Sequence, residues 1–386
     1  MNFRSVVATM SLGSLVMATT PAAEAAYSQT NLISDVPGLA AITDPQLRNP
    51  WGISFSAGSP FWISDQGANL STLYRVDAAG VATKVGLEVA IPTTAAGPQG
   101  PTGQVSNATT SFLLNGTPAS FLFANLNGTI SAWNGAAGTT AQIVASTQGA
   151  VYTGLAQGTS SAGPTLYAAN AATGRIDVFN GSYAPVSLGS SAFVDNDPRL
   201  AGLAPFNVKN IGGELFVTYA LPGRAAQIAA PEGAGAVAVF DPNGNLIRTF
   251  AAGGLLASPW GVTRAPSTFG TFAGALLVGN FSFGVSEINA FDATSGTFLG
   301  TLTDAAGQRL LNPGLWALEF GVGNSTGGPD RLFFTAGINE ERDGLFGAIA
   351  PLQVAAIPEP GTFALIGSGL GLLGALRRRR ASARGG

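Results

Sequence analysis

The chain of 386 residues contains no cysteine and no histidine. Without cysteine, the fold can form no disulfide bond and no thiolate can act as a nucleophile. Without histidine, the chain lacks the commonest general base, the commonest zinc ligand and any Ser-His or Cys-His nucleophile pair. These two absences favour a binding or structural role over an enzymatic one.

Charge is also scarce, since Asp, Glu, Lys and Arg make up only 10% of the residues. Between residues 27 and 356 there are 12 Arg and Lys against 19 Asp and Glu, which leaves a net charge of about −7. An acidic surface with few lysines argues against binding to nucleic acid or to anionic lipid headgroups. We therefore expect no nucleic-acid partner.

What is abundant is a repeated sequence pattern. Asn49-Pro50-Trp51-Gly52-Ile53-Ser54-Phe55 is followed closely by Pro60-Phe61-Trp62-Ile63-Ser64-Asp65, and weaker copies of this pair return along the chain. The landmarks of six copies fall near residues 49, 107, 152, 204, 258 and 312. A period of roughly 50 residues with several short strands in each copy is typical of propeller blades.

The pattern within a repeat predicts a meander of four strands. The first two strands are apolar, and the third alternates and ends in an Asn-Gly or Asp-x-x-Gly turn, which supplies the positive φ that tight hairpins need. The last repeat lacks one strand, and residues 31–34 form an isolated strand that can fill the gap. We therefore predict an all-β chain: a single six-bladed β-propeller of four-stranded antiparallel blades over residues 27–355, closed by the N-terminal strand and monomeric.

Three segments of this core resemble an uncharacterised family of secreted bacterial propeller-like proteins, several of which carry a C-terminal sorting tail. The matching segments are residues 49–53, 124–128 and 334–347. The resemblance spans most of residues 30–350 and supports one domain, but it implies no activity.

Residues 1–26 have the order of a secretory signal peptide. Arg4 precedes an apolar run, and the segment ends in Ala23-Glu24-Ala25, so cleavage is expected after Ala25. The apolar run is too short to span a bilayer. The sequence therefore predicts export through the secretion machinery.

The other end combines three features in a fixed order over residues 356–386. Pro358-Glu359-Pro360 comes first, the apolar run 363–376 follows as a predicted transmembrane helix, and the membrane stop consists of Arg377, Arg378, Arg379 and Arg380. This order resembles a PEP-CTERM sorting tail. The resemblance implies a Gram-negative host, transient anchoring in the inner membrane and processing by an exosortase near Pro358, Glu359 and Pro360, before the protein reaches the cell surface or the medium.

Four oxygen-bearing side chains end the second strands of their repeats, and ring closure would bring them to one face: Asp65, Asn125, Asn170 and Asn280. Carboxylate and amide oxygens are ligands of Ca²⁺, so a metal site built from Asp65, Asn170, Asn280 and Glu340 is one hypothesis. The alternative is that each side chain caps the turn that follows its strand, and this reading is favoured.

Trp51, Trp260 and Trp316 occupy equivalent places near the start of first strands. They either line an aromatic funnel that stacks on sugar rings or pack as core, and core packing is favoured. Glu340, Glu341 and Asp343 form the densest acidic cluster, on a loop that is expected to face the same channel mouth.

Two functions from different classes follow. The first is a non-enzymatic exported protein that binds glycans such as exopolysaccharide, or other matrix components, without a cofactor. The second is a Ca²⁺-dependent lactonase or esterase at the channel mouth, whose ligand set would need no histidine. Fold alone does not decide between them.

Overall fold

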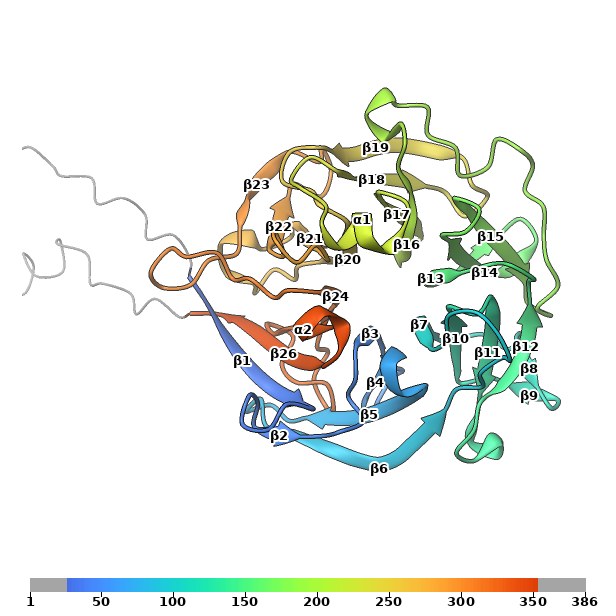
Figure 1. Ribbon diagram of the computed structural model, residues 1–386, viewed down its shortest axis with the longest axis horizontal. Coiled ribbons are helices and arrows are strands. Elements are labelled where there is room, and N and C mark those ends of the chain that lie inside the picture. The colour runs from blue at the N-terminus through green and yellow to red at the C-terminus, as the bar shows by residue number, and fades with distance from the viewer. Residues whose placement is uncertain (1–25, 353–386) are drawn as a thin grey trace, which may run out of the picture. The chain divides into compact units, whose positions relative to one another are not determined.

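The computed structural model describes residues 26–352, which form a ring of six β-sheets around a central axis (Figure 1). Each sheet is a blade of antiparallel strands, and the chain visits the blades in order. The predicted all-β, six-bladed propeller is thus confirmed.

Each blade runs from an inner strand at the axis to an outer strand at the rim. Blade one contains β3 Pro50–Ser54, β4 Phe61–Asp65, β5 Leu70–Val76 and β6 Ala82–Ala90, and blade two contains β7 Pro101–Ser106, β10 Phe121–Asn125, β11 Thr129–Trp133 and β12 Gln142–Ser146. Blade three contains β13 Tyr152–Ser160, β14 Gly163–Asn170 and β15 Arg175–Asn180. Blade four contains β16 Ala204–Ile211, β17 Glu214–Ala220, β18 Gly235–Phe240 and β19 Leu246–Ala252, and blade five contains β20 Pro259–Arg264, β21 Leu276–Asn280, β22 Ile288–Phe291 and β23 Phe298–Thr301.

Blade six is built from both ends of the described chain. Its inner strands are β24 Leu315–Phe320, β25 Leu332–Ala336 and β26 Leu345–Pro351, and the N-terminal strand β1 Tyr27–Ser34 pairs antiparallel with β26 from Tyr27↔Pro351 to Ser34↔Leu345. The short strand β2 Ile42–Thr43 then adds to β1 in parallel. The predicted closure by residues 31–34 is therefore confirmed, and the closing strand is longer than expected.

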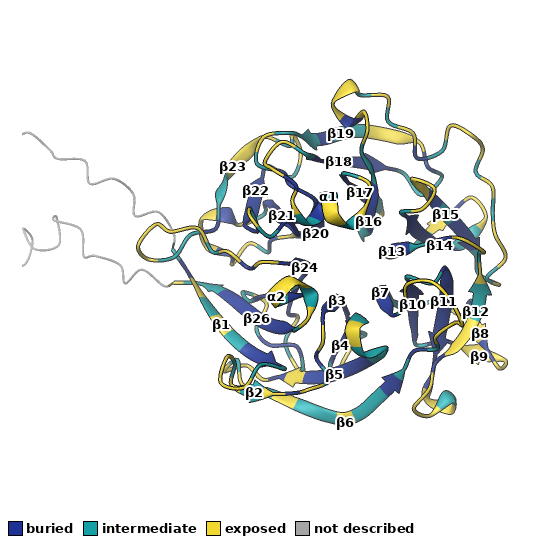
Figure 2. Cartoon of the chain, viewed as in Figure 1, coloured by how far each residue is buried: buried dark blue, intermediate teal, exposed yellow. Residues whose placement is uncertain are grey.

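Burial follows distance from the axis (Figure 2). The second strands β4, β10, β21 and β25 are buried at every residue, whereas the outer strands β6, β12, β19 and β23 are mostly intermediate or exposed. Inner strands are apolar on both faces because neighbouring blades cover both, as in other closed sheet arrays. Connections outside the blades include the hairpin β8 Leu113–Leu114 with β9 Thr117–Pro118, and the helices α1 Arg224–Ile228 and α2 Ile338–Glu341.

Two details of the expected repeats are wrong. The second repeat begins at Pro101, not near residue 107, so the inner strands start at the more even positions 50, 101, 152, 204, 259 and 315. Blade three also has three strands in place of four. Residues 181–203 include Pro185, Gly189 and Pro198 and cross the outside of β15 with only one bridge, Phe179↔Pro185.

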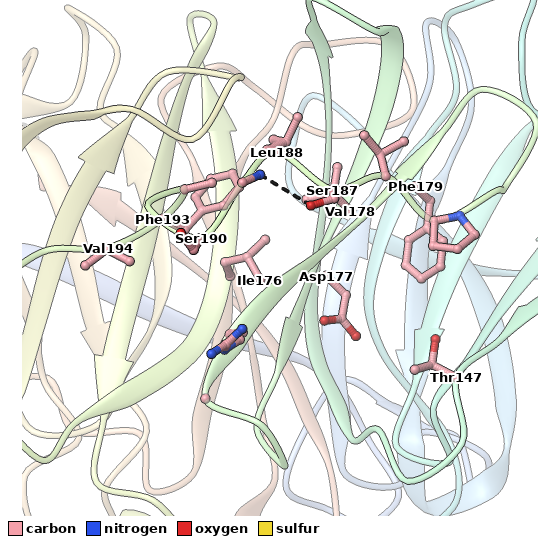
Figure 3. Close-up of a pocket in the computed structure, with 16 residues that line it drawn as sticks. Thr147, Ile176, Asp177, Val178, Phe179, Ser187, Leu188, Ser190, Phe193 and Val194 are labelled. Carbon is pink, nitrogen blue, oxygen red and sulfur yellow. Dashed lines mark hydrogen bonds between the residues drawn. The ribbon is translucent and has the colours of Figure 1, made fainter.

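Where the fourth strand would lie, the structure has a cavity of about 510 Å³ (Figure 3). It is lined by β15 on one side and by the segment 185–194 on the other. The segment is held by Val186, whose N–H donates to Val178 O at 2.8 Å, so the strand edge is only partly paired.

The predictions for the two ends, the signal peptide with Ala25 and the sorting tail with its helix at 363–376, lie outside the described residues. Within residues 26–352, none of the helices has the length and hydrophobicity needed to cross a membrane.

Candidate functional site at the first mouth of the channel

Every inner strand carries a register shift at its second or third residue. In β13, for example, Tyr152 pairs with Asn170 and Gly154 with Ala169, which leaves Thr153 as an extra residue. Such bulges bend the strand and re-aim the side chain of the unpaired residue. The six residues at this position are Trp51, Thr102, Thr153, Phe206, Trp260 and Trp316.

The aromatic members of this set meet at the axis. The rings of Trp51 and Trp316 stack with centroids 3.5 Å apart, and Trp260 stands edge-on to both at 6.2 and 5.6 Å. Phe206 and Phe281 extend the cluster around Trp316. All three tryptophans are no more than 4% exposed. They therefore pack on one another as a plug at the centre of the ring.

One residue further along each inner strand, small side chains close the channel. These residues are Gly52, Gly103, Gly154, Asn207, Gly261 and Ala317. A Cβ on Gly103 would lie 2.2 Å from Leu155 N, and one on Gly261 would lie 2.5 Å from Trp316 O. We call this level the waist. The cavity there measures only about 20 Å³, room for about one water molecule.

On the side where the inner strands begin, which we call the first mouth, two short helices lie near the centre of the ring (Figure 1). Helix α1 begins with Arg224, whose guanidinium carbon lies 4.0 Å from the Phe281 ring centroid and 4.7 Å from that of Trp316. Arginine over aromatic faces gains cation–π attraction. Burial lowers the pKa of Arg224 below its usual value while Glu341 opposes this, so the guanidinium keeps its charge.

Glu341 reaches Arg224 from helix α2. Arg224 Nε donates to Glu341 Oε2 at 2.7 Å, and the other carboxylate oxygen accepts from Asn49 Nδ2 at 3.0 Å. Asn49 Oδ1 in turn accepts from Trp316 Nε1 at 3.0 Å. A continuous chain of hydrogen bonds thus ties the aromatic plug to the ion pair above it.

The backbone that carries Glu341 is strained. Asn339, Glu340 and Glu341 have φ values of 52°, 58° and 66°, and Asn49 has 43°. The left-handed region costs a non-glycine residue roughly 1–3 kcal/mol, and such residues cluster at functional sites. Tertiary packing therefore holds this turn in place, and the turn positions the Glu341 carboxylate beside Arg224.

These groups surround a pocket of about 470 Å³. Trp51 lines it with a largely buried indole whose ring centroid lies 5.2 Å from the Arg224 guanidinium carbon, Gln66 and Gln227 contribute amides, and Arg224 with Glu341 contributes paired charges. The Trp51 indole N–H is buried and has no hydrogen-bond partner among the described residues. An apolar surface with a few convergent polar groups is the ordinary composition of a small-molecule site.

The strand-end residues from the sequence analysis lie in four blades, and each bonds either within its own blade or to the segment that leads into it. Asp65 Oδ2 accepts from Thr72 N at 3.0 Å, and Asn125 Nδ2 donates to Thr129 Oγ1 at 2.9 Å. Asn170 Nδ2 donates to Asp177 Oδ2 at 2.9 Å, and Asn280 Oδ1 accepts from Ala257 N at 2.9 Å. Among the hydrogen bonds of residues 26–352, none joins two of the four. Asn125 and Asn170 bond within the turn that follows their strands, whereas Asp65 bonds the neighbouring strand β5 and Asn280 bonds the segment that precedes β20.

A calcium site at Asp65, Asn170, Asn280 and Glu340 would need several free oxygen atoms pointing to one centre. The side-chain oxygens of Asn170 and Asn280 already accept backbone N–H groups, and Glu340 is exposed and ion-paired with Arg342. Of the proposed ligands only Asp65 has a free buried oxygen, whereas Ca²⁺ takes six to eight. Within residues 26–352 no group of three or more Asp or Glu side chains is arranged to hold a metal. The set does not suit calcium.

The residues that sequence reasoning missed here are Asn49, Gln66, Arg224 and Gln227. Arg224 and Gln227 lie in the connection between β17 and β18, outside any repeat, so periodicity carried no signal for them. Asn49 was visible as the first residue of the repeat motif. Glu341 was picked out with Glu340 and Asp343, and of these three it is the one that lines the pocket.

Residues 356–380 match the PEP-CTERM protein-sorting motif. The motif implies export, transit anchored in a membrane and processing by an exosortase. The predicted sorting tail is thereby confirmed as a sequence feature.

Over the propeller, the chain resembles two proteins of Acanthamoeba polyphaga mimivirus. Uncharacterized protein R648 is 32% identical over 84% of this chain and 80% of the viral protein, and Uncharacterized protein L690 is 30% identical over 86% and 88%. The chain belongs to the family of these viral proteins. Both relatives are uncharacterised, so the family brings no known activity.

Among solved structures, a glucose dehydrogenase matches with a TM-score of 0.48 and 11% identity over 85% of this chain and 99% of that one. A streptogramin B lyase matches with 0.44 and 13% over 84% and 97%, and a gluconolactonase from Xanthomonas campestris with 0.40 and 13% over 85% and 98%. Because all three TM-scores lie below 0.5 and all three identities below 25%, these matches carry no inference about activity.

Proposed function

We propose that this protein is an exported, exosortase-processed binding protein that takes a saccharide in the pocket of the first mouth, at the cell surface or in the extracellular matrix. It acts as a monomer, with no enzymatic step. The sorting motif supports the route out of the cell, and the pocket supports the ligand class.

The observation that carries the ligand class is the combination of an apolar lining with Gln66, Gln227 and the Arg224–Glu341 pair around one pocket. A sugar ring has an apolar face that packs on apolar side chains, such as those of Pro98, Leu126 and Val151 in the lining, and hydroxyls that both donate and accept hydrogen bonds. Amides and a paired carboxylate and guanidinium offer both kinds of partner. The unpartnered Trp51 N–H supplies one further donor.

Tryptophan fluorescence tests this, because Trp51 lines the pocket. Titration of the exported protein with oligosaccharides released from the exopolysaccharide of the producing cells should shift or quench the emission in a saturable manner. The double variant Arg224→Met/Glu341→Gln removes both charges together and should abolish the response without leaving a lone buried charge.

The matched control is Arg248→Met/Glu214→Gln, which removes another ion pair, also beside an aromatic ring, at the rim of blade four. This variant should respond like the parent. A parent protein that showed no saturable response to any fraction, or a double variant at Arg224 and Glu341 that bound as well as the parent, would count against the proposal.

A further inference from the structure

A second cavity lies at the opposite end of the channel, where the inner strands end, which we call the second mouth. It measures about 300 Å³, the lower end of the usual range for ligand pockets. Its lining comes from the ends of β3, β7, β13, β16 and β24, and includes Ser54, Phe55, Gln104, Lys209 and Glu319. Five of the six blades thus converge on it.

Gln104 provides an unsatisfied acceptor in this cavity. Its side-chain NH₂ donates to the backbone carbonyls of Gly52 and Trp62, and because both are acceptors only, the amide orientation is determined. Gln104 is 6% exposed, and its Oε1 has no partner among residues 26–352. A buried carbonyl oxygen without a donor destabilises the fold, and a ligand hydroxyl that donated to it would recover that free energy.

The other lining groups complement a polyol. The Ser54 hydroxyl is buried without a partner and can either donate or accept. Lys209 and Glu319 form an ion pair and remain 32% and 20% exposed, so both keep free hydrogen-bonding capacity. Phe55 is half-buried and presents an apolar ring. Because the two charges cancel, the cavity favours an uncharged ligand.

The waist separates this cavity from the first mouth. At that level the cavity measures only about 20 Å³. The glycines of the waist pack so closely on the neighbouring blade that there is no room even for a Cβ atom. A ligand larger than water cannot pass from one mouth to the other. The two cavities are therefore independent sites on opposite ends of one rigid ring.

We infer that the second mouth binds a neutral hexopyranose unit, so that one chain holds two saccharides and cross-links them. The ligand class rests on the proposed function, whereas the cavity and its residues are separate from it. A rigid monomer with two opposed sugar sites acts as a bridge between polysaccharide strands.

The test uses beads coated with D-glucose, D-galactose or D-mannose and the exported protein. Capture of protein by the beads reports any one site, whereas agglutination of the beads by a monomer requires both sites. The second-mouth variants are Lys209→Met/Glu319→Gln, which removes both charges together, and the milder Ser54→Ala. The first-mouth variant is Arg224→Met/Glu341→Gln, and Arg248→Met/Glu214→Gln is the control. Circular dichroism and thermal melting establish that each variant is folded.

The parent and the control should be captured and should agglutinate one of the three bead types. Lys209→Met/Glu319→Gln should be captured but should not agglutinate, and Ser54→Ala should need about tenfold more protein to agglutinate. Arg224→Met/Glu341→Gln should also be captured through the second mouth, without agglutination.

Each contrary result has one meaning. If Lys209→Met/Glu319→Gln still agglutinates, or if Arg224→Met/Glu341→Gln is no longer captured, the second site is refuted while the proposed function stands. If capture is lost only in Lys209→Met/Glu319→Gln, the second mouth alone holds the coated sugar and the cross-linking role is refuted. If the parent is captured by none of the three bead types, the second site is refuted, and the fluorescence titration with exopolysaccharide fragments decides the proposed function separately.

Discussion

Two sets of equivalent residues in this ring behave in opposite ways. The bulge residues Trp51, Trp260 and Trp316 sit at the same place in three inner strands, and their rings touch at the axis. Asp65, Asn125, Asn170 and Asn280 sit at the same place in four second strands, and none of them bonds to another. Adjacent strands lie ~4.8 Å apart. Residues on the innermost strands therefore meet at the axis, whereas residues one strand further out do not meet one another.

This difference teaches that repeat symmetry predicts convergence only for the innermost strand. At the axis, contacts between blades depend on ring closure and on the small residues of the waist. One strand further out, each polar side chain bonds its own blade or the segment that leads into it. Breaking the ring should thus have a larger effect than removing one of these side chains.

The largest effect is expected from deleting residues 27–34, the strand that closes the ring. The deletion removes the whole ladder with β26 and the buried Tyr27, Leu32 and Ile33, and losing each such side chain costs about 2–5 kcal/mol. The sum, about 6–15 kcal/mol, is as large as the whole stability of an ordinary domain, about 5–15 kcal/mol. The truncated chain should be insoluble or should lose its cooperative melting transition.

Strand complementation provides the matched test of that deletion. A synthetic peptide of residues 26–35 should pair with β26 and restore a cooperative melt, because the missing edge has the same register. A truncated chain that melted like the parent without peptide would show that closure does not hold the axis together.

The second prediction concerns the waist. Gly103→Ala places a Cβ 2.2 Å from Leu155 N and 2.7 Å from Gly154 C, both backbone atoms that cannot move aside cheaply. We expect a loss of about 3 kcal/mol in the free energy of unfolding, measured by chemical denaturation. Gly86→Ala is the control, since a Cβ there meets nothing within 4 Å. Equal stability of the two variants would mean that the blades are not packed backbone to backbone at the axis.

The sequence predicted the repeats, the blade count, the closing strand and the equivalence of the three tryptophans because strands, turns and periodicity are local signals. Pro101-Thr102-Gly103 also carries the pattern Pro-x-Gly of Pro50-Trp51-Gly52, and the start of the second repeat was missed because Thr102 replaces the aromatic residue. The fourth strand of blade three was overpredicted, since a repeat does not reveal where one copy has lost an outer strand.

The candidate site was less predictable. Arg224 comes from a connection between strands, and its place over Phe281 and Trp316 depends on the diameter of the closed ring. Glu341 could be suspected from its acidic neighbours, but the left-handed backbone at residues 339–341 has no sequence signature, because none of the three is glycine. Such positions are determined by tertiary packing and not by local propensity.

The third prediction concerns a strand-end residue, Asn280. Its side chain accepts from Ala257 N at 2.9 Å and donates to Leu255 O at 2.7 Å, both in the segment that leads into β20. Asn280→Ala should cost about 1–3 kcal/mol, because two buried backbone groups lose their partners. Hydrogen exchange should rise locally in blade five and stay unchanged in blade one. A rise on both sides of the ring would mean that the strand-end residues are coupled after all.

The last prediction concerns Asp65, where three other blades carry Asn. Burial raises the pKa of Asp65 well above its usual value of 3.8, with Asp44 adding to the rise, while Thr72 and the more distant Lys84 oppose it. The folded chain therefore holds this proton at pH values where the unfolded chain has released it, and the stabilisation it gives falls as pH rises above about 3.8.

Asp65→Asn should accordingly match the parent near pH 4 and become the more stable of the two as pH rises toward 7, because a neutral amide needs no proton. Denaturation curves at a series of pH values measure this difference, and a chelator should alter neither protein. If Asp65 instead held a cation, Asp65→Asn would be less stable than the parent at pH 7, and chelator would lower the melting temperature of the parent only. Those two results together would indicate that the four strand-end residues form one cation site, and that residues one strand away from the axis also interact between blades.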